Sequence, residues 1–110
     1  PLQLSRINLV TNVAPNANGS FDFMGAHSTG MLGLEANFSG ALNLANIGAG
    51  RMWLAADFGP VSYTADSLSP GAPTPYDSAA TTAIYRLGGG TQLLTLAPAT
   101  AASNVLTGTA

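Results

Sequence analysis

The sequence predicts an all-β protein, and within that class a segment of a right-handed parallel β-solenoid (β-helix). The first observation behind this prediction is spacing, because short runs of alternating apolar and polar residues are centred on Leu34, Leu44 and Leu54, with Tyr63 nine residues further on. The second is composition, because Ala, Thr, Gly, Ser and Asn supply 60 of the 110 residues. Such small side chains fit the tight corners of stacked coils, whose strands lie about 4.8 Å apart.

Low charge is the third observation, and it excludes several other classes of protein. Only 7% of the residues are charged, none is Lys, and the net charge is −2. A disordered tail needs more charge, a nucleic-acid-binding protein needs a basic face, and a coiled coil needs charged heptads. The apolar residues never form the run of about 18 that a transmembrane helix requires. The chain has no cysteine, which removes disulfides, thiolate metal sites and Cys nucleophiles.

In the amino-terminal half, alternation of apolar and polar residues predicts strands over 4–13, 20–24, 31–38 and 42–44. The turns between them are expected over 14–19 and 25–30, which are rich in Asn, Gly and Ser.

In the carboxy-terminal half, strands are expected over 51–56, 61–65, 83–87 and 91–96, with a further strand beginning at 104–106. A Pro/Ala-rich loop is expected at 67–82, because the segment has too many prolines for a central strand and too many small side chains for a core. Ala-rich windows at 79–84 and 97–102 lack an apolar stripe, so neither predicts more than a single helical turn.

Two arrangements of these strands fit the spacing. A β-solenoid stacks them in parallel, whereas an antiparallel β-sandwich, the alternative, pairs them through turns. We interpret residues 1–110 as a single β-solenoid domain or an excerpt of a longer one, since 105–110 read as a strand that enters a turn.

A series of short motifs in the second half resembles a known family. Met52-Trp53-Leu54-Ala55-Ala56-Asp57 is followed by the run Tyr85-Arg86-Leu87-Gly88-Gly89-Gly90, then by Leu94-Thr95-Leu96 and Leu106-Thr107-Gly108. This order resembles the repeats of autotransporter-associated β-strand proteins, which are large secreted bacterial proteins frequent in planctomycetes. The resemblance covers mainly residues 51–108, and the Pro/Ala insertion at 71–82 departs from it. It implies an extracellular or cell-surface parallel β-helix and no enzymatic residues.

The glycine run Gly88, Gly89 and Gly90 invites comparison with a phosphate-binding loop. Such a loop needs a Gly-Lys-Ser/Thr sequence at the start of a helix, and this chain has no Lys. We therefore expect a tight corner with positive φ here, and a second structural turn at Gly108.

Weak candidates for ligand binding are Trp53, Asp57 and Asp66. Parallel β-helices often carry polysaccharide hydrolases or lyases whose acids project from adjacent coils, so Asp57 and Asp66, with Glu35 and Asp22 behind them, are the available acids. Arg51 or Arg86 could bind a uronate or sulfate group. We expect no catalytic residue, because nothing in the spacing shows that the acids converge.

Aromatic residues offer a second possible sugar site. Trp53, Tyr63, Tyr76 and Tyr85 would form a stacking strip if their rings faced outward on successive coils. Alternation sends Trp53 to the face opposite Met52 and Leu54, and we expect Trp53 to lie in the core.

No metal site or cofactor is expected. His27 is the only imidazole and is expected in a solvated loop, and no Asp-x-Asp-x-Asp motif for calcium is present.

The function predicted from these features is structural. We expect a cell-surface or extracellular fibre, sheath or adhesin stalk, in which coils of one chain stack on each other and copies self-assemble into filaments because few charges guard the end coils. The alternative is a carbohydrate-binding or carbohydrate-cleaving β-helix domain that contacts surface glycans.

Overall fold

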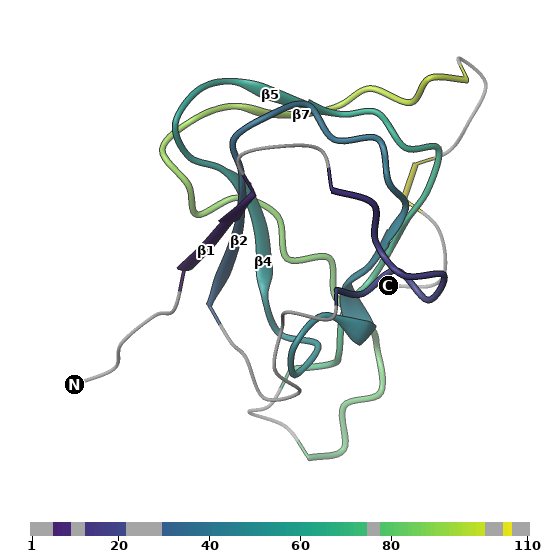
Figure 1. The fold of residues 1–110 in the computed structure, drawn as a ribbon. Coiled ribbons are helices and arrows are strands. Elements are labelled where there is room, and N and C mark those ends of the chain that lie inside the picture. Colours follow the sequence, from purple (N-terminus) through teal and green to yellow (C-terminus); the bar gives the residue numbers. More distant parts are fainter. Residues whose placement is uncertain (1–5, 10–12, 22–29, 75–77, 101–104, 107–110) are drawn as a thin grey trace.

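The structure is a computed structural model, and it describes residues 6–9, 13–21, 30–74, 78–100, 105 and 106. These residues are all-β: short strands are joined by turns, and one 3-10 turn is present (Figure 1). The strands are β1 (Arg6–Leu9), β2 (Met31–Leu34), β3 (Leu42–Asn43), β4 (Trp53–Ala56), β5 (Val61–Tyr63), β6 (Leu68–Ser69) and β7 (Leu94–Leu96), and η1 (Leu44–Asn46) follows β3. No helix among the described residues is long and apolar enough to span a bilayer.

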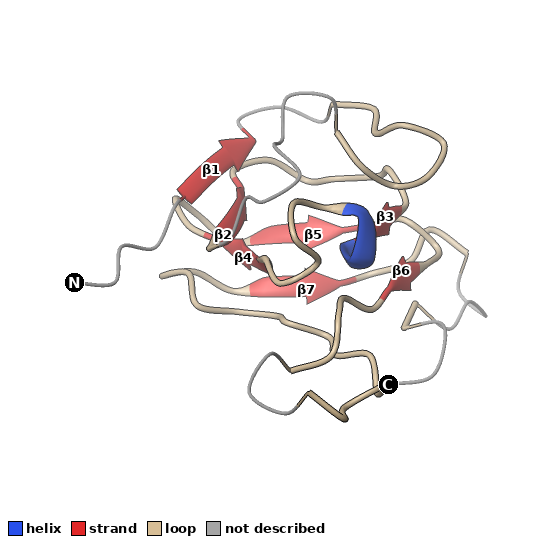
Figure 2. Ribbon diagram, turned by 90° about the horizontal axis from the view of Figure 1, so that it is seen from below, coloured by secondary structure: helices blue, strands red, loops and turns tan. Residues whose placement is uncertain are grey.

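The strands form three small sheets, with the orders β1-β2-β4, β5-β7 and β3-β6, and every strand pair is parallel. Figure 2 shows β5 lying beside β7 and β3 beside β6. The antiparallel pairing of a sandwich is therefore not the pairing found between the described strands. Two isolated antiparallel bridges, Ala56–Gln92 and Gly71–Ile84, lie outside the named pairs.

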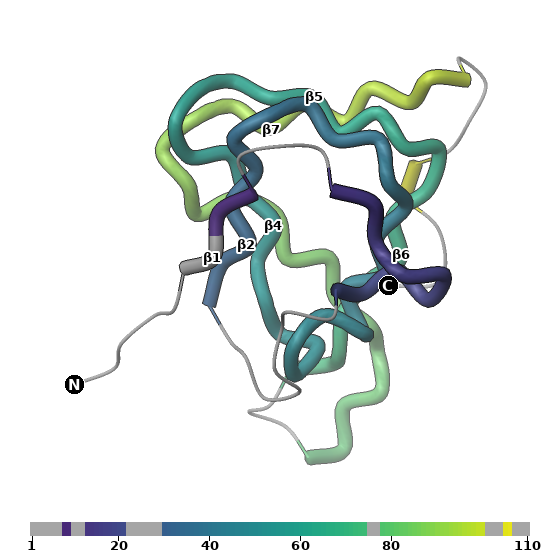
Figure 3. The backbone as a smooth tube through the Cα atoms, viewed as in Figure 1, coloured from purple at the N-terminus to yellow at the C-terminus, as the bar shows by residue number. Residues whose placement is uncertain are grey.

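Successive stretches of the chain, which we call passes, visit the three sheets in the same order. The second pass contains β2, Phe38 and β3, and the third contains β4, β5 and β6. Parallel bridges from Leu54 to Leu87 and from Leu68 to Leu106 place a fourth pass, which contains β7, beside the third. β1 belongs to a first pass beside the second. In Figure 3 the blue, teal and green parts of the tube follow one another along much of this path.

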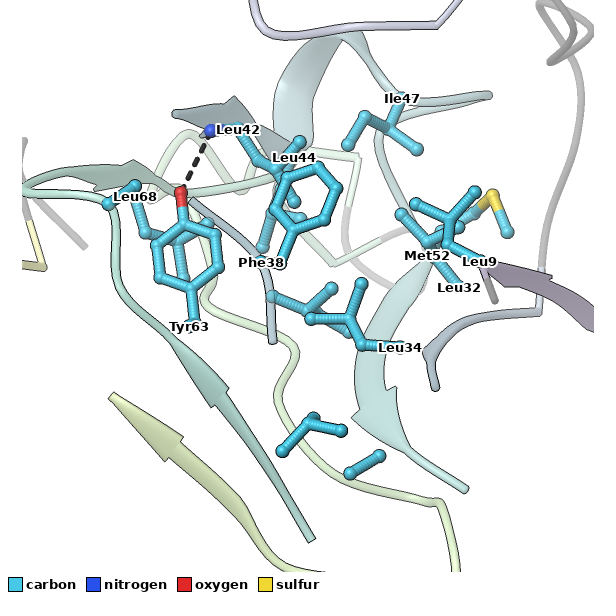
Figure 4. Packing of buried hydrophobic residues seen from close by; sticks show 14 of the residues in the cluster. Leu9, Leu32, Leu34, Phe38, Leu42, Leu44, Ile47, Met52, Tyr63 and Leu68 are labelled. Carbon is cyan, nitrogen blue, oxygen red and sulfur yellow. Dashed lines mark hydrogen bonds between the residues drawn. The ribbon is translucent and has the colours of Figure 1, made fainter. Parts of the chain in front are cut away.

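The core lies between the three sheets, and columns of aliphatic side chains build it. Leu32 pairs in register with Leu54, and Leu34 pairs with Leu9 on one side and Ala56 on the other. Because parallel partners point to the same face, each inward residue stacks on the inward residue of the next pass. The largest fully buried side chains, many of them drawn in Figure 4, are Tyr63, Phe38, Leu32, Leu34, Leu42, Leu44, Ile47, Met52, Leu54 and Leu68.

Among the described residues, Tyr63 is the one phenol fully buried in this core. Its ring stacks on that of Phe38 with the centroids 6.3 Å apart, and Phe21 meets Phe38 edge-on at 6.2 Å. The phenol oxygen accepts a hydrogen bond from the backbone nitrogen of Leu42 at 2.9 Å, the dashed line in Figure 4, and donates to the carbonyl of Ser67 at 2.7 Å. Burial raises the pKa of Tyr63 above its ordinary value, and the hydrogen bond from Leu42 opposes this only in part.

Several details differ from the sequence prediction. The segment 67–82, expected to be a loop, contains β6, and Leu68 within it is fully buried. Proline did not prevent this strand, because Pro70 follows its last residue. The strand expected over 83–87 is reduced to isolated bridges at Ile84 and Leu87.

The alternation predicted over 42–44 ends after β3. There the side chain of Asn43 accepts a hydrogen bond from the nitrogen of Ala45 at 3.0 Å and starts η1. Neither Ala-rich window forms a helix within its described residues, and of the strand expected over 20–24 only 20 and 21 are described, without strand structure.

Replacement of Tyr63 by Phe is expected to destabilise the fold by about 1–3 kcal/mol at pH 7, because the Leu42 nitrogen and Ser67 carbonyl lose their buried partner. The raised pKa also predicts a pH dependence. Below pH 10 the phenol is protonated in both states, whereas above it the unfolded chain ionises first, so stability falls as pH rises towards the folded-state pKa.

Urea unfolding at pH 7 and at alkaline pH measures both effects. Tyr63→Phe should lose part of the alkaline fall in stability, while Tyr85→Phe, at a half-buried phenol that donates to the Leu68 carbonyl at 3.0 Å, should retain it. An unchanged alkaline slope in Tyr63→Phe would contradict the assignment.

Candidate functional site

Two acidic side chains stand side by side where β2 and β4 end. Glu35 follows β2 and Asp57 follows β4, and the strand residues that precede them, Leu34 and Ala56, are register partners. The two acids therefore occupy neighbouring rungs of one sheet, which are about 4.8 Å apart.

Two further side chains complete this cluster, which we call the acidic corner (Asn8, Glu35, Asp57 and Thr91). The Asn8 amide nitrogen donates to Glu35 at 3.1 Å and to Asp57 at 3.5 Å, and the Thr91 hydroxyl donates to the Asp57 carbonyl oxygen. The Asn8 amide oxygen is buried, has no hydrogen-bond partner in the described part of the chain, and lies where a β-carbon on Gly33 would be 2.3 Å away. The acidic corner thus ties together side chains from all four passes.

The hydrogen bonds of the acidic corner hold neighbouring passes together. Asp57 is only 6% exposed, so a polymer in solution has little access to its carboxylate. Asp66 is exposed and lies beyond β5, where it accepts hydrogen bonds from the Thr100 nitrogen at 3.0 Å and hydroxyl at 2.9 Å. Asp57 and Asp66, predicted as weak ligand candidates, therefore bind different partners at different corners, and the structure does not pair them.

Trp53 lies on the outer face of the first sheet, so the prediction that it belongs to the core is wrong. It is 46% exposed, whereas Met52 and Leu54 on either side are fully buried. Because side chains alternate between the two faces of a strand, either Trp53 or both Met52 and Leu54 can point inward. The two aliphatic side chains fill the narrow interior more readily than one large indole, so Trp53 points outward. The described residues do not form the strip of outward aromatic rings, because Tyr63 is fully buried. Tyr76 lies outside the described residues.

Arg86 stands next to Trp53 in the following pass. The parallel bridge between Leu54 and Leu87, with the Leu54 nitrogen donating to the Arg86 carbonyl at 2.9 Å, sets this position. Arg86 is 7% exposed as a residue, and its guanidinium donates to the carbonyls of Gly50 at 3.2 Å, Ala72 at 2.7 Å and Pro73 at 3.3 Å. Burial, and to a smaller extent the positive charge of Arg51, lower the pKa of Arg86. An arginine keeps its charge despite such a shift.

The glycine run forms a corner beside β4. Gly88 and Gly89 adopt φ of 103° and 86°, a region that residues with a β-carbon rarely enter. Gly90 is needed for a different reason, since a β-carbon there would lie 2.1 Å from the Ala56 carbonyl oxygen. Gly108, predicted at another turn, is outside the described residues.

Sequence reasoning missed the roles of Asn8, Thr91 and Arg86. Single residues on the first and fourth passes carry no local signal, and only the register between passes shows that they meet the acids or Trp53. The described residues bring together no group of three or more His, Cys, Asp or Glu that could hold a metal ion. His27 is outside the described residues.

Comparison of the chain with family models, with curated proteins and with solved structures found no match.

Replacement of Gly90 by Ala is expected to destabilise the protein by about 2 kcal/mol or more, because the backbone of β4 or of the corner must move to relieve the contact with Ala56. Gly59→Ala is the matched control, since a β-carbon at Gly59 meets nothing within 4 Å. The control should change stability by no more than about 0.5 kcal/mol. Thermal unfolding of both variants measures the difference, and equal midpoints would contradict the close approach.

Proposed function

We propose that this chain is part of a β-solenoid with a structural role, as a fibre, sheath or adhesin stalk on a bacterial surface. The observation that carries this proposal is that successive passes visit three parallel sheets in the same order. Parallel strands that stack in this way hydrogen bond along one axis, so the array grows by adding passes and not by enlarging its cross-section. Such a construction suits a protein whose task is to span distance.

The extracellular location and the kinship are part of the same proposal. They are supported by the resemblance of residues 51–108 to autotransporter-associated β-strand repeats and by the absence of cysteine, which is ordinary in large bacterial surface proteins. The low charge also fits, because stability then comes from backbone ladders and an aliphatic interior rather than from ion pairs.

The fourth pass leaves the interior partly open, which supports growth by addition of further passes. Leu87, Leu94 and Leu96 are only partly buried and pack against the core. Their register partners in the third pass, Leu54, Val61 and Tyr63, are buried. We propose that the first pass of a second copy covers this layer, since β1 has the same strand direction and, among the described strands, pairs on one side only.

Assembly of copies end to end is tested by Leu96→Pro. The Val61 nitrogen donates to the Leu93 carbonyl and the Ala97 nitrogen to the Tyr63 carbonyl, so Leu93, Thr95 and Ala97 face β5 while Leu94 and Leu96 direct their backbone groups to the open edge. Proline at 96 therefore removes an edge donor and no bond to β5.

Negative-stain microscopy at rising concentration should show elongated particles for the unmodified chain and for the control Thr95→Val. It should show single particles for Leu96→Pro. An unmodified chain that stays monomeric throughout would refute the assembly.

The stacking of passes is tested by a disulfide between register partners. Ser62→Cys with Thr95→Cys places two thiols on adjacent parallel rungs, about 4.8 Å apart and within the range for a disulfide. The chain has no cysteine of its own, so any crosslink is assigned without ambiguity. In the control pair, Ser62→Cys with Leu93→Cys, a shift of two residues increases the separation to about 8 Å.

The first pair should crosslink quantitatively under mild oxidation without loss of thermal stability, and the control should not. Preferential crosslinking of the control pair would rule out this register and with it the stacked passes.

Carbohydrate binding is a second candidate function, and the exposure of Trp53 favours it. An exposed indole on a β-sheet face is a flat apolar surface against which a sugar ring can stack. Cleavage is not proposed, because Asp57 is buried in the acidic corner and Asp66 is held separately by Thr100.

A further inference from the structure

All three basic residues of the chain map to one end of the sheet β1-β2-β4. Arg6 is the first residue of β1, and it is aligned through Met31 with Trp53, the first residue of β4. Arg86 follows at the next rung, and Arg51 precedes Trp53 by two residues. With a rung spacing of about 4.8 Å, the Arg86 position is one rung from Trp53 and the Arg6 position is two rungs away on the other side.

The acids of this sheet lie at its opposite end. Glu35 and Asp57 follow the last residues of β2 and β4, so the length of a four-residue strand, about 13 Å, separates them from the arginine end. Within the described part of the chain, neither Arg51 nor Arg86 forms an ion pair. The positive charge at this end is therefore not neutralised by a neighbouring carboxylate of the described residues.

The two arginines whose side chains are described, Arg51 and Arg86, contribute to the positive charge at this end of the sheet in different ways. Arg86 is buried and its guanidinium is held by backbone carbonyls, one of them that of Gly50, so it supplies a fixed positive charge three residues before Trp53 in the third pass. Arg51 is exposed, and its charge is close enough to influence the pKa of Arg86. Arg51 is thus the residue able to donate hydrogen bonds to a ligand in solution, with Arg86 strengthening the local field.

Among the described residues, the fourth pass places few side chains beside the outer face of β4. Arg86 is followed by Leu87, which packs against the core, and then by Gly88 and Gly89, which carry no side chains. A β-carbon at either glycine would meet nothing within 4 Å, so the described residues leave the surface open beyond Leu87, along β4 from Trp53.

We propose that this surface, made of Trp53 and Arg51 with Arg86 beneath, binds an anionic polysaccharide. A sugar ring stacks on the Trp53 indole while its carboxylate or sulfate group accepts hydrogen bonds from Arg51. The inference rests on the carbohydrate-binding candidate above and adds the chemical class of the ligand. A nucleic acid is disfavoured, because the chain has a net charge of −2 and only three basic residues to set against a continuous phosphate backbone.

Intrinsic fluorescence gives a direct test, since Trp53 is the only tryptophan of the chain. The unmodified protein is titrated with polygalacturonate and with its methyl-esterified form, and with dextran sulfate and neutral dextran. The charged member of each pair should shift or quench the emission, and added salt should weaken this binding because the Arg51 contact is ionic. The neutral members should bind at least about tenfold more weakly, which corresponds to the loss of one charge-assisted hydrogen bond.

Variants locate the site. Arg51→Gln should weaken binding of polygalacturonate about tenfold or more and reduce its salt dependence. Trp53→Ala, followed by affinity electrophoresis in gels that contain the polymer, should abolish retardation. Phe58→Ala is the control, because Phe58 is 72% exposed but lies past the acidic end of β4, and its removal should leave binding unchanged.

Three outcomes would overturn the proposal, and they separate its two parts. Equal binding of the charged and neutral polymers would refute the anionic class and leave carbohydrate binding standing. Absence of binding by all four polymers would refute both. Equal binding of polyglutamate or of a single-stranded oligonucleotide would show an attraction to anions without recognition of a sugar.

Discussion

Parallel in-register pairing between passes constrains every other feature of this chain. A parallel pair cannot be closed by a tight hairpin, so the chain must travel around the interior before it returns beside itself. That route brings each inward residue onto the inward residue of the previous pass, as Leu54 lies on Leu32, and it builds the core in columns. The same rule stacks outward residues, which is why Glu35 meets Asp57 and Arg86 stands beside Trp53.

Stacking of outward residues creates an electrostatic problem, because like charges on adjacent rungs repel. At the acidic corner the Asn8 amide donates to both carboxylates and offsets that repulsion. At the other end of the sheet the three arginines are spread over three passes, and the guanidinium of Arg86 is turned to backbone carbonyls instead of towards Arg51. The charged residues described at these two ends of the sheet therefore each have a defined place in the ladder.

The all-β class, most strand positions and the turn before Phe21 could be predicted from the sequence, because alternation and turn residues are local signals. The burial of Leu68 could not, since its neighbours are prolines and small residues and the contact that buries it comes from other passes. Trp53 shows the opposite case: alternation correctly separated it from Met52 and Leu54, and only the choice of which face points inward was wrong. In the acidic corner, Asn8 meets Glu35 and Asp57, which are 27 and 49 positions away, and Thr91 meets Asp57 from 34 positions away. Contacts over such separations depend on the register between passes, which one sequence alone does not reveal.

Passes of unequal length keep the same register because the extra residues of a longer pass form a loop outside the sheets. The two ends of this loop are hydrogen bonded to each other, and we call this point the neck. Leu32 and its partner Leu54 are 22 residues apart, whereas Leu54 and Leu87 are 33 apart. Gly71 and Ile84 form the neck by exchanging two backbone hydrogen bonds, at 2.8 and 3.1 Å. The Arg86 guanidinium holds the first two residues of the loop by donating to the carbonyls of Ala72 and Pro73. Lengthening the loop that starts and ends at this neck costs conformational entropy that grows only slowly with the number of added residues. The fold thus offers a permissive position at which evolution, or a protein engineer, can insert a foreign peptide without altering the pairing between passes.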